Sequence, residues 1–508
     1  MLLRNASVSR SSSFSQSGYF PHPAHAPSFA RLPIPWSSTG APRDSREADM
    51  LLGLALALSS YGAPLYRVEH RIAKAAEDLS LPVSVFCLPS TIMVAIGDGS
   101  ARHPCRVQYL SYSYGVNVGK LHQVDRLARR VSALRKALKT DEKRRASAAT
   151  TTPSVQQSRR ILESPDSTNS VPSSPPPVPQ DTTTTQQQQE KHNDGTIDDC
   201  LTDLQTITSD TDYSWPVRHF AGAMQSGVIA VLLFRGTWAD GLAAFFLGGV
   251  TSLCLRLSNF LGLEGAVELL TSIAIACLAR FMEIFAFWDG LSGTGLGLCH
   301  EVVSLAGVCA LLPGTAITLG MLELGSTNPV AGSVRMFQAF VRALKLGYGL
   351  TLGSRLAIHL MQLFTDYDGS NPDACPVAGA PMDVWRLPLW IPMNLSIMIN
   401  LRAFPWQWWH MSLTSLTGFC VNLLASMWFN SDITAGIAAF SIGLLGNLYA
   451  RQTDDVAIGA ILAGIAWLVP GGIGVRGAIA AIAKDATSSG TAFGIDMITR
   501  AMSIAVGI

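Results

Sequence analysis

The chain has 508 residues, of which 48% are hydrophobic and only 14% are charged, and its formal net charge at pH 7 is +1. A soluble globular protein carries about 25% charged residues, so this composition argues against a chain built from soluble domains alone. The near-zero net charge excludes the strongly basic surface that attracts nucleic acid, and we expect no nucleic-acid partner. Charged residues are concentrated before Trp215, and apolar segments follow it.

The N-terminal 45 residues lack the apolar core of a secretory signal peptide. Residues 1–43 contain four arginines, many serines and no acidic residue. An organellar transit peptide has this composition, and so does a Ser/Pro-rich disordered tail. We predict a disordered tail over residues 1–45 and keep the transit peptide as the alternative.

Residues 46–138 have the pattern of a small soluble domain. Apolar residues recur at helical spacing between Glu47 and Ser80, with an interruption near Gly62 and Pro64. Three short segments follow, VSVFCLP, TIMVAI and CRVQYLSYS, and turn residues separate them as they separate strands. A basic amphipathic pattern then runs to residue 138, so the sequence predicts an α+β domain with a three-stranded sheet.

Residues 139–214 contain the runs SSPPPVP and TTTTQQQQ and few large apolar side chains. Such a composition cannot bury enough apolar surface to fold, so we predict a disordered linker. Its basic start, KRRAS, would favour an anionic membrane surface, although a charged run can equally be solvated.

The remaining chain predicts about ten membrane spans, because a bilayer core about 30 Å thick requires roughly 20 apolar residues per helix. We expect a first half of five helices over residues 215–364, a loop over 365–386 and a second half over 387–508. The expected spans are 216–234, 238–257, 265–287, 298–320, 331–362, 387–401, 406–428, 433–450, 455–470 and 475–508. The chain ends within an apolar run at Ile508, as it would if the gene model were truncated.

Lys and Arg are frequent before the first span, which places the N-terminal region in the cytosol, or in the mitochondrial matrix if the transit peptide is real. Each half has an odd number of expected spans. The second half would therefore run inverted relative to the first, as in many secondary transporters. We expect a multi-pass protein of the plasma membrane or an endomembrane, with a mitochondrial location as the alternative.

Two Pro-Gly pairs occur at matching places in the two halves, Pro313-Gly314 in LLPGT and Pro470-Gly471 in LVPGG. Proline removes a backbone donor and glycine tolerates unusual dihedral angles, so each pair should break or kink its helix. A break at membrane depth exposes helix ends that can contact a solute. An ordinary helix end at the membrane interface is the alternative.

Ionisable residues inside apolar spans cost at least about 2.5 kcal/mol each at the bilayer centre and therefore indicate function. Arg280 and Glu283 share one helix face and could form an internal pair. A carboxylate together with an arginine suits a zwitterionic solute, since one binds its ammonium and the other its carboxylate. The alternative is structural pairing or contact with lipid headgroups. The predicted solute or ion pathway comprises Arg280, Glu283, Glu301, Pro313, Gly314, Glu323, Asn328, Arg335, Arg342, Pro470 and Gly471.

Enzymatic motifs are absent from the sequence: it has no nucleophile elbow, HExxH, Walker loop or strand-linked GxGxxG. The nine cysteines form no CxxC pair and no metal-ligand cluster, so we expect no metal or other cofactor. Four of them, Cys254, Cys277, Cys299 and Cys309, lie in apolar segments and are interpreted as small buried side chains in a reduced compartment.

Two segments resemble the threonine/serine exporter family, and the long polar insert resembles its fungal branch, the pheromone-regulated membrane proteins. The segments are SYGAPLYRVEHRI (60–72) and CHEVVSLAGVCALLPGTAITLGMLELGSTNPVAGSVRMFQAFVRALKLGYGLTLG (299–353). The resemblance covers residues 49–137 and 215 to the end. It implies a soluble domain fused to two five-helix halves, and efflux of small amino acids driven by an ion gradient. The motif positions that carry over are Gly62-Ala63-Pro64, Arg67-Val68-Glu69, Pro313-Gly314, Gly332 and Arg335.

The sequence therefore predicts a polytopic α-helical membrane protein that exports a small amino acid such as threonine or serine, in exchange for protons. Glu323, Glu301 or Glu283 would be the proton-linked carboxylate, and Arg335 or Arg342 the anion contact. A homo-oligomer is left open. The alternative function is a non-transporting membrane organiser or signalling protein that acts through its soluble domain.

Overall fold

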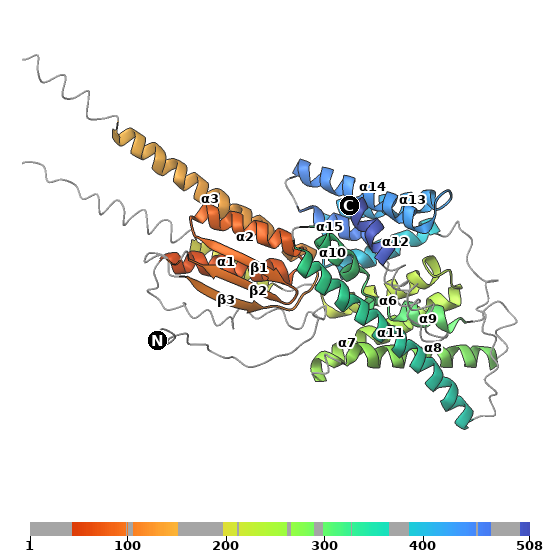
Figure 1. Cartoon of the computed structure of the whole chain (residues 1–508). Helices are drawn as coiled ribbons and strands as arrows, with labels where there is room; N and C mark the ends of the chain where they lie inside the picture. The colour runs from red at the N-terminus through yellow and green to blue at the C-terminus, as the bar shows by residue number, and fades with distance from the viewer. Residues whose placement is uncertain are drawn as a thin grey trace, which may run out of the picture. The chain divides into compact units, whose positions relative to one another are not determined.

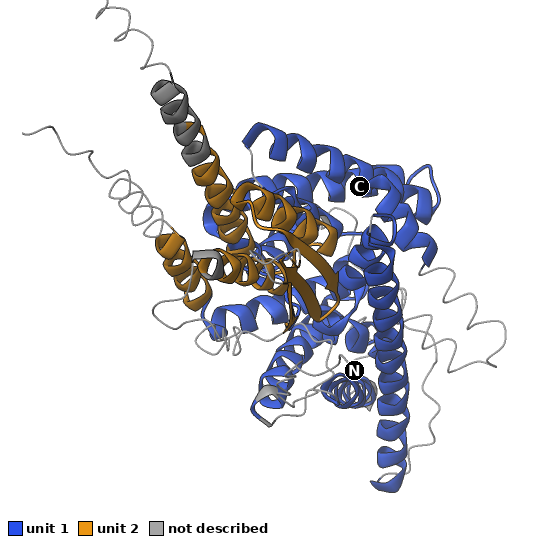
Figure 2. Ribbon diagram, turned by 60° about the vertical axis from the view of Figure 1, so that its left-hand side comes forward, with its two compact units in different colours: residues 1–25, 113–119, 211–508 blue, residues 26–112, 120–210 orange. Residues whose placement is uncertain are grey.

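The computed structural model describes residues 43–97, 99, 105–150, 197–210, 213–261, 266–288, 298–326, 328–364, 386–453, 456–468 and 498–508. The predicted N-terminal tail, most of the predicted linker, the loop between the halves and the pair Pro470-Gly471 lie outside these residues. The described residues belong to two compact units (Figure 2). Unit 2 contains those of 26–112 and 120–210, and unit 1 contains those of 113–119 and 211–508.

Unit 2 contains a three-stranded antiparallel sheet with helices before and after it, in the order that the sequence predicts (Figure 1). The strand order is β1-β2-β3, and Phe86, Met93 and Tyr109 are aligned across the sheet. Ile92 and Val94 of the central strand are fully buried. Helix α2 packs against β1 and α1 packs against β2. The elements are α1 (Arg43–Ser60), α2 (Leu65–Leu79), β1 (Val83–Leu88), β2 (Thr91–Ile96), β3 (Arg106–Ser111) and α3 (Val118–Thr150).

The Gly62-Ala63-Pro64 motif forms the turn between α1 and α2. Gly62 has a φ of 95°, a conformation that glycine adopts without a steric penalty. Its N–H donates to the Ser59 carbonyl, and the Ala63 N–H donates to the Leu58 carbonyl. This pair of bonds is a Schellman motif, which ends α1 and satisfies its last carbonyls. The motif therefore has a structural role in unit 2.

The Arg67-Val68-Glu69 motif joins α2 to the rest of unit 2. Val68 is fully buried, and the Glu69 carboxylate accepts a hydrogen bond of 2.9 Å from the Cys87 N–H on β1. A neighbouring ion pair of 2.9 Å between Arg71 and Asp125 connects α2 with α3. These contacts fix the order of helix, sheet and helix that the sequence pattern suggests.

Residues 197–209 are helical, whereas the sequence predicts disorder throughout 139–214. Cys200, Leu204 and Thr208 recur every four residues and are buried, so one face of this helix is packed in unit 2. Arg130 of α3 forms an ion pair of 3.0 Å with Asp203. Helix α3 likewise continues to Thr150, past the expected end at residue 138. The predicted linker is polar overall, and for that reason the prediction of disorder missed the short amphipathic pattern at 197–209.

Unit 1 consists of helices. The first group is α6 (Trp215–Leu232), α7 (Trp238–Leu261), α8 (Val267–Trp288), α9 (His300–Gly307), the 3₁₀ helix η4 (Cys309–Leu311), α10 (Gly314–Leu324) and α11 (Pro329–Phe364). The second group is α12 (Arg386–Asn400), the 3₁₀ helix η7 (Pro405–Gln407), α13 (Trp408–Ala425), α14 (Ser431–Thr453) and α15 (Ala457–Ile465), followed by a helix over Ile498–Gly507.

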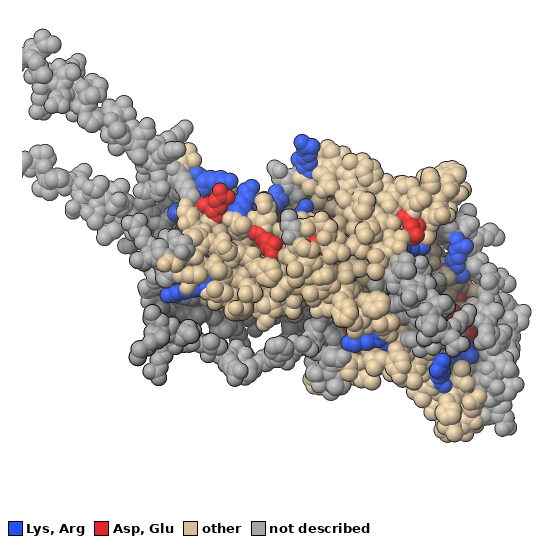
Figure 3. Space-filling view, in the orientation of Figure 1, with Lys and Arg blue, Asp and Glu red and all other residues tan. Residues whose placement is uncertain are grey.

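Three described helices are long and apolar enough to cross a membrane: Trp238–Ser258, Val267–Ala286 and Ser431–Thr453. A fourth crossing is formed if the bent pair of His300–Gly307 and Cys309–Leu324 counts as one span. Large apolar side chains of α7 are exposed along one helix face, namely Trp238, Leu242, Phe246, Leu253, Leu257 and Phe260. Few charged side chains interrupt the surface of unit 1 in Figure 3. A face of this kind suits lipid, and the chain is an integral membrane protein.

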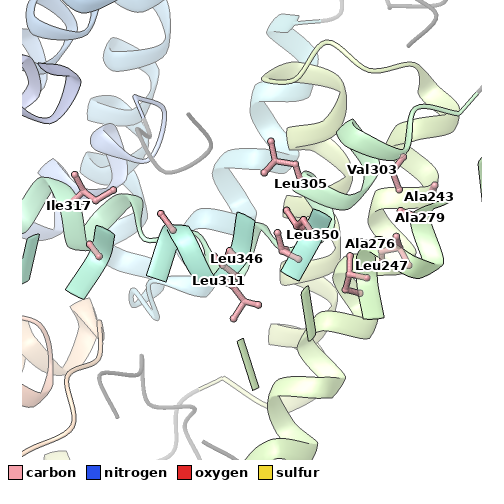
Figure 4. Close-up of a cluster of buried hydrophobic side chains, with 14 of the residues drawn as sticks. Ala243, Leu247, Ala276, Ala279, Val303, Leu305, Leu311, Ile317, Leu346 and Leu350 are labelled. Carbon is pink, nitrogen blue, oxygen red and sulfur yellow. The ribbon is translucent and has the colours of Figure 1, made fainter. Parts of the chain in front are cut away.

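The interior of the first group is a cluster of small and branched side chains (Figure 4). It includes Leu247 of α7, Ile275 of α8, Leu305 of α9, Ile317 of α10 and Leu346 of α11, all at most 2% exposed. Close helix contact depends on small residues, as is usual in membrane bundles. Gly349 and Gly353 of α11 face Ser272 and the Ile273 carbonyl of α8, where a Cβ atom would collide. The core thus holds the broken helix against α7, α8 and α11.

Candidate functional site

The fourth expected span is broken within the membrane unit. Helix α9 ends at Gly307, and α10 begins at Gly314 with Pro313 as its N-cap residue, at φ −80° and ψ 23°. The two limbs are bent by 51°. A break is therefore present where the first Pro-Gly pair predicts it, although the chain already leaves the α-helix at Val308. The second pair, Pro470-Gly471, lies outside the described residues.

A buried ion pair lies where α10 ends and α11 begins. The Arg335 Nε atom is 2.9 Å from a Glu323 carboxylate oxygen, and the exposed fractions of the two side chains are 7% and 0%. Gly332, one turn before Arg335, is so close to α10 that a Cβ atom would lie 2.7 Å from the Gly320 carbonyl oxygen. The small residues bring the two helices together, and their proximity allows the short side chain of Glu323 to reach Arg335.

Asn328 begins α11 beside this pair. Its side-chain oxygen accepts a hydrogen bond of 3.3 Å from the Ala331 N–H, as an N-cap residue does. Asn328 is only 4% exposed. The structure thus brings Glu323, Asn328 and Arg335 into one helix–turn–helix corner.

Tyr114 covers the Arg335 guanidinium. It belongs to residues 113–119, which follow β3 in sequence and are part of unit 1. The Arg335 Cζ atom is 4.5 Å from the centre of the Tyr114 ring, which is the geometry of a cation–π contact. Burial raises the pKa of the Tyr114 phenol, so the hydroxyl stays protonated at neutral pH. No pattern in the sequence indicates this contact.

Backbone hydrogen bonds hold the segment 113–119 in place. The Val118 N–H donates to the Leu401 carbonyl at 2.9 Å, and the Gly119 N–H donates to the Arg402 carbonyl at 3.2 Å. A Cβ atom on Gly119 would lie 2.8 Å from the Arg402 oxygen, so only glycine fits there. The position of Tyr114 is therefore fixed by main-chain contacts within unit 1.

A second ion pair joins α8 and α11. Arg342 Nε lies 2.6 Å from a Glu268 carboxylate oxygen, and the exposed fractions are 14% and 6%. The sequence places Arg335 and Arg342 on one face of α11, but the structure directs them to carboxylates on different helices. Glu268 was missed because it lies in the first turn of its helix, where an acidic residue is also expected for the helix dipole.

A third polar cluster lies farther along α8. Arg280 Nη1 is 2.7 Å from Glu283 Oε2, so the internal pair that the sequence predicts is present. His300, the first residue of α9, joins it, with Nδ1 at 2.9 Å from Arg280 Nη1 and 3.1 Å from Glu283 Oε1. Glu301 is exposed and does not enter the cluster.

Asp240 extends the third cluster to α7. Its carboxylate accepts hydrogen bonds from the Cys299 N–H at 2.8 Å and from the N–H and hydroxyl of Thr237 at 2.7 and 3.0 Å. Asp240 is 1% exposed. Sequence reasoning missed it because an acidic residue in the first turn of a helix has an ordinary capping explanation.

The polar groups of the first helix group therefore form two sites at different depths. Glu268 and Glu283 are fifteen residues apart on α8, which corresponds to about 22 Å along the helix. One site contains the pairs Glu323–Arg335 and Glu268–Arg342, and the other contains Asp240, Arg280, Glu283 and His300. Among the described residues, no group of three or more His, Cys, Asp or Glu side chains has the arrangement of a metal site.

Cys299 is disulfide-bonded, so the expectation of a reduced buried thiol is wrong at this position. The residue immediately precedes α9 and so lies at a helix end. Disulfides persist in oxidising compartments. Within the described ranges, the free cysteines are Cys87, Cys105, Cys200, Cys254, Cys277, Cys309 and Cys420.

Comparison with known proteins identifies the family. The ThrE model of threonine/serine exporters matches residues 49–144 and 186–357, which is more than half of the chain. The chain belongs to the threonine/serine exporter family. The match includes the first motif and the whole broken-helix region, and it resumes before the helix at 197–209.

The curated relatives are fungal. The chain is 27% identical over 485 residues to pheromone-regulated membrane protein 10 of Saccharomyces cerevisiae, covering 90% of this chain and 52% of the relative. It is 25% identical over 483 residues to an uncharacterized protein of Schizosaccharomyces pombe, covering 90% and 54%. The chain thus spans about half the length of these relatives. No solved structure matches.

Proposed function

We propose that this chain exports a small amino acid of the threonine/serine type, and that the Glu323–Arg335 pair is its solute contact. The observation that carries the proposal is a buried pair of opposite charges at the end of a broken membrane helix. Glu323 has no exposed surface and Arg335 is 7% exposed in its side chain. Charges in such a place are costly and rare, and where they occur they pair with one another and mark substrate or ion pathways.

An amino acid matches this pair chemically. Its carboxylate can take the place of Glu323 on the planar guanidinium, and its ammonium can take the place of Arg335 on the carboxylate. The exchange keeps the net charge of the site at zero, because both the pair and the solute are zwitterionic. The Tyr114 ring would then hold the guanidinium in position while its carboxylate partner changes.

The arrangement of the spans is part of the proposal. We infer ten spans in two inverted halves of five, with the soluble domain in the cytosol and the protein in the plasma membrane or an internal membrane. In that topology the start of α9 lies at the non-cytosolic end, which agrees with the disulfide at Cys299. The Glu323–Arg335 pair then lies toward the cytosolic end, where the exported solute enters.

Efflux of labelled threonine and serine from proteoliposomes tests the proposal. Glu323→Gln and Arg335→Ala should each abolish efflux at equal protein abundance. Arg355→Ala, at an exposed position of the same helix, and Asp432→Asn, in a partly exposed pair with Arg500, should leave efflux unchanged. Equal efflux from wild type and the two site variants would instead favour a membrane organiser that acts through its soluble domain.

A further inference from the structure

We propose that His300 carries the proton that drives transport, by exchanging its hydrogen-bond partner between Arg280 and Glu283. The proposal rests on the proposed function, because it names the proton-linked group of the same transporter. Sequence reasoning considered three carboxylates for this role. The geometry points to the imidazole beside one of them.

The exchange follows from the atoms that surround His300 Nδ1. Arg280 Nη1 lies 2.9 Å away and Glu283 Oε1 lies 3.1 Å away. A guanidinium nitrogen only donates and an ionised carboxylate only accepts. An Nδ1 atom without a proton therefore accepts from Arg280, and an Nδ1 atom that carries a proton donates to Glu283. In the neutral tautomer that has its proton on Nε2, Nδ1 accepts from Arg280, and uptake of a second proton on Nδ1 makes the ring a donor to Glu283.

The cluster around His300 contains one cationic side chain and two carboxyl groups. Arg280 is positive, whereas Glu283 and Asp240 are negative if both are ionised, so the cluster with a neutral histidine has a net charge of −1. The three groups bonded to the Asp240 carboxylate are all donors, as an ionised carboxylate requires. Protonation of His300 would bring the cluster to zero.

The other charged groups on the helices that pack against α9 lie several turns from this cluster along their helices, as does Arg256 on α7, sixteen residues after Asp240. On α6, Arg218 and His219 lie in the first turn, at the end away from the turn to α7. On α8, Glu268 is fifteen residues from Glu283 and is paired with Arg342. The next residue, Glu301, is exposed. The His300 side chain is 21% exposed, so the ring is not sealed within the helix bundle.

The broken helix connects the proton site with the proposed solute site. His300 is the first residue of α9, and Glu323 is the penultimate residue of α10, the other limb of the bent pair. When His300 exchanges its hydrogen-bond partner, the contact between α9 and α8 changes. Because the two limbs meet at an irregular backbone, they can change their angle without breaking either helix. Protonation at one end can thereby alter the Glu323–Arg335 corner at the other.

Titration of His300 tests the proposal directly. The full chain, labelled with ¹⁵N-histidine, is placed in lipid nanodiscs, and the imidazole resonances of wild type and His300→Gln are compared between pH 5 and 9. The resonance missing from the variant should titrate, and its midpoint should shift when threonine is added. His359→Gln, at an exposed site on α11, should leave that resonance unchanged. A resonance that does not titrate in this range would overturn the proposal.

Transport measurements on the same proteins separate the two hypotheses. His300→Gln should retain exchange of labelled for unlabelled threonine. Net threonine efflux driven by a pH gradient should fall at least tenfold in this variant. The proton movement that accompanies efflux should fall by the same factor. A variant that keeps gradient-driven efflux and proton movement would also overturn the role of His300. Wild-type protein that neither exchanges nor exports threonine or serine would refute the proposed function, and the titration would still decide whether His300 binds a proton.

Discussion

Glu323 and Arg335 come from consecutive helices, lie 2.9 Å apart, and are both almost completely removed from solvent. Eleven residues separate them in the sequence, yet the turn after α10 and the close approach at Gly332 bring them face to face. The pair therefore depends on the same helix–turn–helix corner that follows the break at Pro313. Structure and proposed solute binding are coupled at this corner.

Removing one member of the pair should destabilise the protein more than removing both. Glu323→Gln leaves the Arg335 charge buried without its carboxylate, and breaking a buried pair costs about 3–5 kcal/mol. In detergent, the midpoint temperature of thermal unfolding should be clearly lower for the single variant than for wild type. The double variant Glu323→Gln/Arg335→Gln should recover most of that loss while remaining inactive in efflux. Equal unfolding temperatures of single and double variants would show that the two side chains are not coupled.

Gly332 should not tolerate alanine. The added Cβ atom would lie 2.7 Å from the Gly320 carbonyl oxygen, so α10 and α11 would have to separate and the Glu323–Arg335 distance would increase. We expect a destabilisation of about 1–3 kcal/mol and a loss of efflux. Gly325→Ala is the matched control, because its nearest atom would be 3.7 Å away at a helical φ of −78°. A stable and active Gly332→Ala variant would contradict the close packing.

Tyr114 should contribute to solute binding through its ring. Tyr114→Phe retains the aromatic face beneath Arg335, whereas Tyr114→Ala removes it. A cation–π contact contributes about 0.5–2 kcal/mol, so we expect Tyr114→Ala to raise the half-saturating threonine concentration about fivefold. The phenylalanine variant should behave nearly as wild type in the same efflux assay. Similar values for the alanine and phenylalanine variants would exclude a role for the ring.

Asp49 makes the stability of unit 2 dependent on pH. Burial raises its pKa from 3.8 to about 6. A pKa that is higher in the folded state means that the folded state binds the proton more tightly, so this stabilisation is complete below pH 4 and is lost as the pH rises through 6. Because the side chain is partly exposed, we expect Asp49→Asn to increase stability at pH 7 by about 1–2 kcal/mol.

Hydrogen exchange of the α1 backbone amides in the full chain measures this effect. Wild type should lose protection relative to Asp49→Asn between pH 4 and pH 7, after correction for the intrinsic exchange rates. At pH 4 the two proteins should be nearly equal. A difference that is the same at both pH values would show that the carboxyl group of Asp49 does not titrate in this range.

The sequence predicted the elements better than their contacts. Hydropathy located the apolar helices within a few residues, as for α7, expected at 238–257 and observed to Leu261. Proline and glycine chemistry located the break before α10, and helical spacing paired Arg280 with Glu283 because both lie on one helix. Periodicity determines which residues share a helix face, but it does not specify the element that packs against that face.

For that reason, Glu268 could not be assigned to Arg342, nor Tyr114 to Arg335. Each contact joins segments far apart in the chain. Each also depends on close packing at small residues, and the hydrophobic periodicity does not say which helices pack together at those residues. Asp240 and the helix at 197–209 were missed for another reason. Asp240 is an acidic residue in the first turn of a helix, and the helix at 197–209 is a polar amphipathic stretch. Both patterns have ordinary explanations, so the burial of these residues was not predicted.

The central claim is that the Glu323–Arg335 corner binds an exported amino acid. The most direct test is efflux of labelled threonine and serine from proteoliposomes, with wild type, Glu323→Gln, Arg335→Ala and the control Arg355→Ala at equal abundance. We expect efflux from wild type and the control and none from either site variant. Efflux that is unchanged in both site variants, or absent from wild type, would contradict it.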